Sequence, residues 1–279
     1  MRVFPEANDV TRLTGRFESS PISTPTAVAT TDILQTMLVR ELSVVIPVFR
    51  EGEAVEPVLR ALSAGVKTPH EIFVVYDFDE DPTVPVIQRL ALELPAVRGL
   101  RNDLGRGVLN AMKAGIAASN GQYVLISMSD GSDEPHVIDS MVALARAGAD
   151  VVSASRYMPG GRQLGGPLLK RLMSRVAGLT LHWLAGVPTH DPTNNFKLYS
   201  RRYLDDVTIE STAGFELALE LTVKATLAGR PVAEVPTTWR DRTAGQSNFK
   251  LRKWLPHYLH WYREAFVGRW LRRRGTSAR

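Results

Sequence analysis

Cysteine is absent from this chain of 279 residues, which rules out disulfide bonds and every site that needs a thiolate. A reducing compartment is compatible with this composition. Long apolar runs are also lacking, because the best candidate, residues 176–187, contains His182 and is well short of the roughly 20 residues needed to cross a bilayer. The N-terminus shows no basic segment followed by an apolar stretch, so no secretory signal is recognised.

Hydrophobic residues make up 44% of the chain, which is enough for a substantial core and predicts a globular protein. The N-terminal segment, 1–40, is rich in Ser, Thr and Pro and has no sustained period, so we expect a disordered polar leader. A folded domain is expected at 41–250 and a basic, aromatic helix at 251–279.

The formal net charge of +5 is concentrated near the C-terminus. Residues 250–274 contain eight basic residues and one acid, so this segment carries +7 and the remaining chain −2. Six aromatic residues interleave with these charges, which is typical of a helix lying on an anionic membrane surface. The alternative is a terminal helix docked on the core by its aromatic side chains. Rings among arginines also suit single-stranded RNA, but the slightly acidic body argues against a nucleic-acid partner.

Short apolar runs alternate with helical segments from residue 42 onward. Strands are predicted at 42–48, 71–76, 97–101, 122–128 and 150–154, and helices at 53–64, 82–94, 107–118 and 135–147. This βαβ repetition predicts an α/β fold with a mainly parallel central sheet flanked by helices. After residue 155 the spacing predicts a helix at 166–185, a strand at 195–199, a helix at 215–228 and a strand at 232–239.

The fourth predicted strand ends in a cluster of acids, Asp130, Asp133 and Glu134, just before Pro135. Ligands of open α/β sheets bind at the carboxyl ends of the strands. Oxygen ligands spaced in this way suit Mg²⁺ or Mn²⁺, which takes much of its shell from water and substrate phosphates. The alternative is that Asp133 and Glu134 cap the next helix.

Two further segments are predicted at the same edge of the sheet. Pro47 near the end of the first strand and a glycine before the next helix place Phe49 and Glu51 there. Gly105 and Gly107 look like half of a dinucleotide fingerprint, but a third glycine is missing and the motif does not follow the first strand. A nicotinamide-dependent enzyme is therefore disfavoured.

A series of motifs over about residues 42–250 resembles the family-2 glycosyltransferases, in particular their dolichyl (polyprenyl) phosphate mannosyltransferase branch. The motifs are Val45-Ile46-Pro47-Val48-Phe49-Arg50-Glu51, Gly105-x-Gly107 with Ala111 and Gly115, the strand end at Asp130, Ser155-Arg156-Tyr157 with Gly160-Gly161, Ser174-Arg175, Asp191-Pro192-Thr193-Asn194-Asn195-Phe196-Lys197, Glu220, Glu234-Val235-Pro236 and Asp241-Arg242-Thr243-Ala244-Gly245-Gln246-Ser247. The resemblance implies a GT-A type nucleotide-sugar-binding fold, a divalent metal, Mg²⁺ or Mn²⁺, and inverting sugar transfer.

The resemblance also implies roles for individual residues. Those expected around the nucleotide sugar are Pro47, Phe49, Glu51, Asp77, Gly105 and Ser247. Asp130 would hold the metal, with Ser132 or Asp133 as the second contribution. Arg156, Arg175 and Arg242 fall where the family places arginines on phosphates, whose oxygens match the guanidinium fork. Glu220 has Lys224 four residues on, so an ordinary helix-face ion pair is its alternative.

The chain departs from the family pattern at three places. Where two adjacent acids usually follow the second strand, it has Tyr76-Asp77-Phe78-Asp79. Asp130-Gly131-Ser132-Asp133 replaces the usual Asp-x-Asp, and Asn248 stands where a lysine is common. These positions fall at the expected base, metal and phosphate contacts.

The implied activity is transfer of a hexose from a GDP- or UDP-linked donor to a polyprenyl phosphate. A lipid phosphate needs only cations to position it, with Arg156 and Arg175 as candidates, whereas a hydroxyl acceptor needs a base, Asp191 or Glu220. Transfer to a hydroxyl of a glycan or glycolipid, and a non-catalytic nucleotide-sugar-binding protein, are the alternatives. We expect a cytoplasmic protein, peripheral on the inner face of the membrane, with the amphipathic segment 166–185 near the lipid or packed on the core.

Overall fold

The computed structural model describes residues 40–241 and 251–276, and in the last segment the side chains of residues 254–271. Residues 1–39 of the predicted polar leader lie outside the described residues. Two predicted site residues, Arg242 and Ser247, lie outside them as well.

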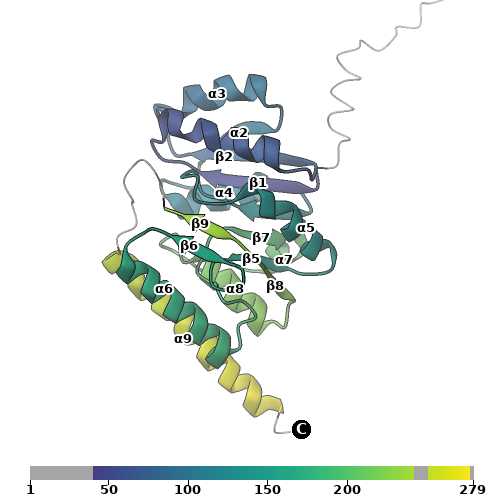
Figure 1. The fold of residues 1–279 in the computed structure, drawn as a ribbon, viewed down its shortest axis with the longest axis vertical. Coiled ribbons are helices and arrows are strands. Elements are labelled where there is room, and N and C mark those ends of the chain that lie inside the picture. The colour runs from purple at the N-terminus through teal and green to yellow at the C-terminus, as the bar shows by residue number, and fades with distance from the viewer. Residues whose placement is uncertain (1–39, 242–250, 277–279) are drawn as a thin grey trace, which may run out of the picture. The chain divides into compact units, whose positions relative to one another are not determined.

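A seven-stranded sheet with the order β3-β2-β1-β4-β7-β5-β8 forms the centre of the fold (Figure 1). Its strands are β1 (Leu42–Pro47), β2 (His70–Tyr76), β3 (Val97–Arg101), β4 (Tyr123–Ile126), β5 (Val151–Ser155), β7 (Lys197–Ser200) and β8 (Val232–Pro236). Neighbouring strands pair in parallel except that β7 runs antiparallel to both β4 and β5. The predicted mainly parallel α/β sheet is confirmed. The reversal of β7 brings the loop before it to the edge where β4 and β5 end.

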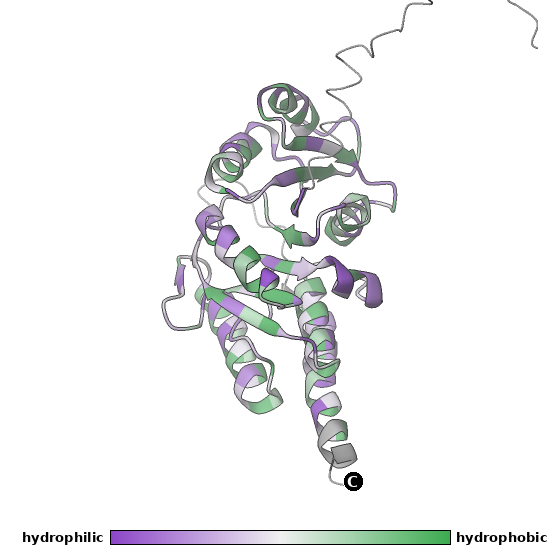
Figure 2. Cartoon of the chain, turned by 90° about the vertical axis from the view of Figure 1, so that its right-hand side faces the viewer, coloured by the Kyte–Doolittle hydropathy of each residue, from purple (hydrophilic) through white to green (hydrophobic). Residues whose placement is uncertain are grey.

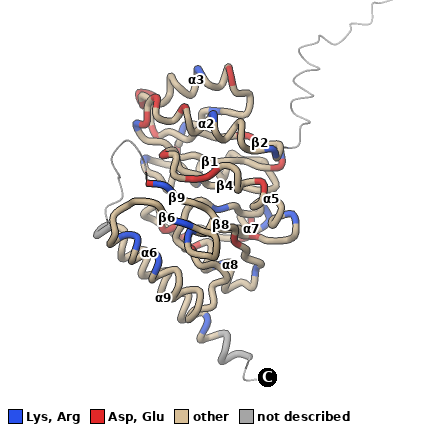
Figure 3. The backbone as a smooth tube through the Cα atoms, in the orientation of Figure 1, with Lys and Arg blue, Asp and Glu red and all other residues tan. Residues whose placement is uncertain are grey.

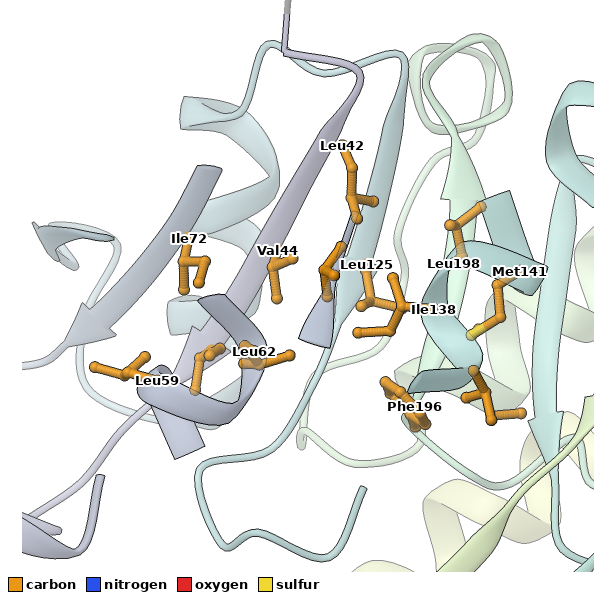
Figure 4. Packing of buried hydrophobic residues seen from close by; sticks show 14 of the residues in the cluster. Leu42, Val44, Leu59, Leu62, Ile72, Leu125, Ile138, Met141, Phe196 and Leu198 are labelled. Carbon is orange, nitrogen blue, oxygen red and sulfur yellow. The ribbon is translucent and has the colours of Figure 1, made fainter. Parts of the chain in front are cut away.

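The central strands are apolar because helices cover both of their faces. All six residues of β1 are buried, as expected for a strand inside a parallel sheet. Alternate residues face opposite ways, so Val44 belongs to one hydrophobic cluster and Val45 to another. In Figure 4 the side chains of Val44 and Leu125 pack with Leu59 and Ile138 from the covering helices.

Helices on the first face are α2 (Val55–Gly65), α3 (Thr83–Glu93), η2 (Pro135–Val137) and α5 (Ile138–Arg146), and those on the second are α4 (Val108–Ala118), α7 (Arg201–Asp206) and α8 (Leu217–Leu227). A short turn, η1 (Gly52–Ala54), leads into α2 and contacts α3. The predicted helices are thus confirmed to within a few residues. The α4 helix lies very close to β1, because a Cβ at Gly115 would fall 2.3 Å from Cγ1 of Val45.

The predicted single strand at 232–239 is wrong, because the structure divides it into β8 and β9 (Thr238–Arg240). Pro236 has no N–H to donate and ends the pairing with β5. Thr237 then donates its N–H to the carbonyl oxygen of Ser155, and β9 pairs instead with β6 (Arg162–Leu164) as a separate ribbon. The strand predicted at 195–199 begins only at Lys197.

The segment predicted as one helix at 166–185 comprises α6 (Leu168–Thr180) and a π-helical turn, η3 (Leu181–Ala185). The last helix, α9 (Leu251–Thr276), packs against α8 and η3 and runs beside α6 (Figure 1). Trp254 and Trp261 are buried, so part of the aromatic content of α9 holds it on the core. Along α9, hydrophobic and hydrophilic residues alternate toward the C-terminus (Figure 2). In the described parts of the chain, no helix combines the length and apolar character needed to cross a membrane.

Candidate active site

The residues predicted around the nucleotide sugar lie after three neighbouring parallel strands. Phe49 and Glu51 follow β1, which ends at Pro47, Asp77 follows β2, and Asp130 lies beyond β4. Glu51 accepts a hydrogen bond on Oε1 from the Ser129 hydroxyl at 3.1 Å, which joins the ends of β1 and β4. The structure therefore gathers this part of the predicted site at one edge of the sheet.

The segment after β1 has a backbone conformation that its neighbours hold in place. Arg50 has a φ of 57°, in the left-handed region that side chains other than glycine rarely occupy. Its N–H donates to Oδ2 of Asp81 at 2.8 Å, and the hydroxyl of Thr83 accepts from the N–H groups of Glu51 and Gly52 at 3.0 and 3.1 Å. Because Asp81 and Thr83 are buried, this turn is fixed from below.

Asp77 ties the loop after β3 to the end of β2. Its Oδ1 accepts from Nδ2 of Asn102 at 2.7 Å, and its Oδ2 accepts from the N–H of Gly107 at 2.9 Å. The Asn102 amide also donates to the carbonyl oxygen of Gly105 at 2.7 Å. Gly105 and Gly107 have φ values of 96° and 131°, which explains why glycine occupies both positions.

The acidic turn after β4 separates its two aspartates. Asp130 accepts on Oδ1 from the N–H of Ser132 at 3.1 Å, while Oδ2 of Asp133 accepts from the hydroxyl of Ser127 and the N–H of Met128, both at 3.1 Å. Burial raises the pKa of the Asp133 carboxyl to about 7, and the nearby Asp130 carboxylate acts in the same direction. Asp133 thus braces the turn from inside.

The helix-cap alternative for the two acids before Pro135 is wrong. The η2 helix has no side-chain capping bond, and Glu134 instead accepts from the N–H of Thr238 at 2.8 Å. Glu134 thereby fastens β9 to the turn. Asp133 is used within the turn itself, as its bonds to Ser127 and Met128 just after β4 show.

The sheet edge that carries Glu51, Asp77 and Asp130, which we call the donor edge because the nucleotide sugar is predicted there, fits a metal held mainly by substrate phosphates. Among the residues that the structure describes, no three His, Asp or Glu side chains converge as a protein-only metal site. Mg²⁺ and Mn²⁺ do not need one, since one or two carboxylates and substrate phosphates suffice. Asp130 lies at the same sheet edge as Glu51 and Asp77 and is chemically suited to that arrangement.

Arg156 and Asp191 form a buried bidentate ion pair beside this edge. Nε of Arg156 lies 2.6 Å from Oδ2 of Asp191, Nη2 lies 2.9 Å from Oδ1, and the Arg156 N–H also donates to Oδ2 at 3.1 Å. Burial alone would raise the pKa of Asp191, but Arg156 holds it below the ordinary value. Asp191 is completely buried and poorly suited to accept a proton near neutral pH.

Ser174 of α6 reaches the same ion pair. Its Oγ lies 3.2 Å from Nη2 of Arg156 and 2.9 Å from the hydroxyl of Thr193. Arg175, the neighbour predicted to bind phosphate, is exposed on α6. The basic residues of α6 are spread along that helix (Figure 3). Ser174 and Thr193 belong to the motifs found in the sequence, but the sequence did not indicate their contact with each other or that of Ser174 with Arg156.

Lys197 is another residue whose role the sequence did not indicate. It is completely buried and donates from Nζ to the carbonyl oxygens of Asp191 and Asn194 at 2.9 and 2.6 Å. Burial lowers the pKa of Lys197 to about 7, although Asp191 opposes the shift. A lysine between Phe196 and Leu198 in a predicted strand is the signal that could have drawn attention to it.

Glu220 lies on α8 and is completely buried. Its oxygens accept from the N–H groups of Glu210 and Ser211 at 2.6 and 2.8 Å and pair with Nζ of Lys224 at 2.8 Å. The ion pair offered as the alternative reading of Glu220 is therefore present. Both carboxylate oxygens hold the segment that leads into α8.

Comparison with known proteins agrees with this geometry. The model of glycosyl transferase family 2 matches residues 43–208. Polyprenol monophosphomannose synthase of Mycolicibacterium smegmatis is 30% identical, over 76% of this chain and 85% of that protein. Undecaprenyl-phosphate mannosyltransferase of Micrococcus luteus is 29% identical, over 73% and 85%, and dolichol-phosphate mannosyltransferase of Saccharomyces cerevisiae is 27% identical, over 81% and 87%.

A solved structure shares the fold. Glucosyl-3-phosphoglycerate synthase from Mycobacterium tuberculosis, crystallised with Mn²⁺, uridine diphosphate and glucosyl-3-phosphoglycerate, superposes with a TM-score of 0.59. It is 18% identical, and the match covers 91% of this chain and 86% of that one. The two proteins thus share their arrangement of strands and helices.

Proposed function

Because the chain belongs to glycosyl transferase family 2, we propose that it is an inverting glycosyltransferase that moves a hexose from a nucleotide diphosphate sugar to a polyprenyl phosphate. The observation that carries this proposal is the convergence of Glu51, Asp77 and Asp130 at one sheet edge, beside the buried Arg156–Asp191 pair. Relatives named for mannosyl transfer to polyprenol, undecaprenyl and dolichol phosphates match over most of their length and support the lipid phosphate as acceptor.

On the donor side, Asp130 would hold Mg²⁺ or Mn²⁺ together with the diphosphate. A metal bound there neutralises the charge that develops on the leaving nucleoside diphosphate. Pro47, Phe49, Glu51 and Asp77 line the edge where the nucleoside lies, and the bonds of Asp77 keep the glycine loop beside it. Gly105 belongs to that loop.

On the acceptor side, Arg156 and Ser174 offer a fixed cation and a hydroxyl to a phosphate. A phosphate monoester already carries negative charge near pH 7, so its oxygen attacks the anomeric carbon without a base. Asp191 and Glu220, the two candidates for a base, are both completely buried and occupied by hydrogen-bond and ion-pair partners. This occupation favours a phosphate acceptor over a hydroxyl.

The exposed face of α6 and η3 is suited to bind the membrane in which a polyprenyl phosphate acceptor lies. Its exposed apolar side chains are Leu168, Leu169, Leu172, Val176, Trp183 and Leu184. Lys170, Arg171 and Arg175 lie among them, and each basic residue near an anionic leaflet adds roughly 1 kcal/mol of attraction. We therefore place the protein peripherally on the anionic inner face of a membrane, with Arg175 turned to lipid phosphates.

The test is transfer of labelled hexose from GDP- and UDP-linked donors to polyprenyl phosphate in detergent, with Mg²⁺ or Mn²⁺. Asp130→Asn should lower kcat by about 100-fold or more, because a group that stabilises the leaving diphosphate is lost. Asp205→Asn makes the same change at an exposed position of α7 and should leave kcat unaltered.

Two results would contradict the proposal. Full activity of Asp130→Asn with unchanged metal dependence would remove Asp130 from the site. If the unmodified protein consumed no donor with either metal, the non-catalytic binding protein would become the better description.

A further inference from the structure

Four side chains at the donor edge form what we call the aromatic–arginine cluster: Phe49, Phe78, Arg50 and Arg106. The Phe49 and Phe78 rings meet edge to face, with centroids 6.0 Å apart and planes at 71°. The guanidinium carbon of Arg106 lies 4.9 Å from the centre of Phe78, and that of Arg50 lies 5.5 and 5.7 Å from the centres of Phe49 and Phe78.

Both arginines are held at this place by the backbone around them. Arg50 occupies the left-handed region, which costs a non-glycine residue about 1–3 kcal/mol and persists only where the surroundings impose it. Asp81 and Thr83 impose it through the bonds to the turn. Arg106 lies between the two glycines that Asp77 and Asn102 tie to β2.

Neither guanidinium is neutralised by a carboxylate. In the described part of the chain, no Asp or Glu lies within ion-pair distance of Arg50 or Arg106, although Arg89 and Arg101 nearby pair with Glu53 and Asp79. Phe49 is 46% exposed. Phe78 is half-buried. Accessible rings beside unpaired N–H forks suit a ligand that is flat and carries hydrogen-bond acceptors.

We propose that Phe78, Arg50 and Arg106 are specificity-determining residues for the base of the donor nucleotide. The inference rests on the proposed function, because it assumes that a nucleotide sugar binds at this edge. Phe78 and the Arg106 guanidinium above it form the stacking surface, since bases stack on both rings and guanidinium planes. Arg50, almost equidistant from both rings, presents its fork to the edge of the base.

The chemistry of that fork selects a purine with an oxo group at C6. Such a base presents two adjacent acceptors, O6 and N7, which a guanidinium binds bidentately, whereas adenine presents one acceptor beside an amino donor. The departure of this chain at Tyr76-Asp77-Phe78-Asp79 supports the idea. A second acid in place of the Phe78 ring would pair with the arginines and occupy the donors that a base needs.

The experiment is calorimetric titration of the full chain, with Mg²⁺, using GDP, IDP, 7-deaza-GDP, ADP and UDP. GDP and IDP should bind alike, because both keep O6 and N7, and 7-deaza-GDP and ADP should bind about tenfold more weakly. Phe78→Ala should weaken all the nucleotides together by about tenfold. Arg50→Ala should remove the preference for GDP over 7-deaza-GDP.

Arg50→Gly is the second variant. Glycine adopts the left-handed backbone of position 50 without strain, so the protein should fold normally while the guanidinium is removed. It should lose the same preference as Arg50→Ala. Arg98→Ala removes an exposed arginine from β3 and should bind all five nucleotides like the unmodified protein.

The outcomes distinguish failure of the proposed function from failure of the proposed base recognition. If the unmodified protein binds no nucleotide, the proposed function fails. If it binds nucleotides but Arg50→Gly keeps the preference for GDP over 7-deaza-GDP, or Phe78→Ala binds like the unmodified protein, the aromatic–arginine cluster does not read the base.

Discussion

At the scale of single residues, the proposed acceptor side of the site depends on charges that are buried in pairs. Removing a carboxylate from water is costly unless a cation and hydrogen bonds compensate for it. Asp191 has both, from Arg156 and from the N–H of that residue. Lys197 supports the same loop from beneath by donating to two of its carbonyl oxygens.

Asp191→Asn should lower the free energy of unfolding by about 3–5 kcal/mol, because it leaves the Arg156 guanidinium buried without its anion. Urea denaturation at pH 7 measures the loss, and Asp205→Asn serves as the exposed control. The pKa of Asp191 is depressed in the folded protein, so the contribution of the pair is present above the ordinary range of an aspartate and is lost as pH falls through the folded pKa. An Asp191→Asn variant as stable as the unmodified protein would contradict this role.

The buried Lys197 should also make the free energy of unfolding depend on pH. Its pKa of about 7 in the folded protein lies below the ordinary lysine value of 10.5, so between these values the unfolded chain binds more protons and stability rises with pH. Lys197→Met has no such group and should lack this rise. At pH 10 it should also be less stable by about 1–3 kcal/mol, because buried carbonyl oxygens lose their donor.

Unfolding free energies of both proteins from pH 7 to pH 10 provide the measurement for Lys197. The stability advantage of the unmodified protein should widen as pH rises. Parallel curves would mean that Lys197 does not change its protonation on unfolding in this range.

At the scale of elements, α6 is the helix whose docking decides where Ser174 and the exposed apolar face lie. It approaches the loop before β7 so closely that a Cβ at Gly178 would fall 2.3 Å from the carbonyl oxygen of His190. Tyr262 of α9 donates a hydrogen bond to the hydroxyl of Thr180 at 2.9 Å and supports α6 from another side. A small residue at position 178 is therefore a requirement of packing.

Gly178→Ala should destabilise the protein by about 1–3 kcal/mol, because a backbone oxygen blocks the new methyl group. Activity should fall too, since α6 would carry Ser174 away from Arg156. Gly65→Ala is the matched control, because its methyl would meet only a side-chain carbon at 3.3 Å. The unfolding temperatures and hexose transfer rates of the two variants provide the measurement. Equal stability and equal activity of both variants would contradict the tight docking of α6.

At the scale of the whole molecule, the proposed membrane surface and the proposed acceptor site meet on α6, which continues into η3. The exposed apolar side chains of α6 and η3 belong to the helix from which Ser174 contacts Arg156. A lipid phosphate could thus reach the site from the surface on which its isoprenoid chain remains.

Vesicle sedimentation tests the surface. The unmodified protein should bind vesicles that contain anionic lipid and be released by salt, because basic residues contribute to the attraction. Replacing both Trp183 and Leu184 by Ser should weaken binding by about tenfold or more, since each apolar side chain contributes more than 1 kcal/mol when buried.

Leu92→Ser is the control for the vesicle experiment, because Leu92 on α3 is 88% exposed but lies on another element. It should bind vesicles like the unmodified protein. Equal binding by the Trp183 and Leu184 double variant would remove α6 and η3 from the membrane surface.

The sequence by itself determined the α/β class, the order of the elements up to β5 and the edge at which the predicted site residues lie. These follow from local rules, because hydrophobic periodicity and the parallel arrangement of strands place Glu51, Asp77 and Asp130 together. The sequence could not predict that the strand ends at Pro236. Whether a strand continues depends on the acceptor that the N–H of the following residue meets, here the carbonyl oxygen of Ser155.

Only the tertiary structure decided how the charged residues of the site are used. The sequence presents Asp191, Glu220 and Asp133 as equally available carboxylates, but burial and partners distant in the chain assign one to Arg156, one to backbone amides of the segment before α8, and one to the end of β4. In the same way, folding brought Arg50 and Arg106 onto Phe78. Protonation and pairing depend on the surroundings of a group, and those surroundings are created by the fold.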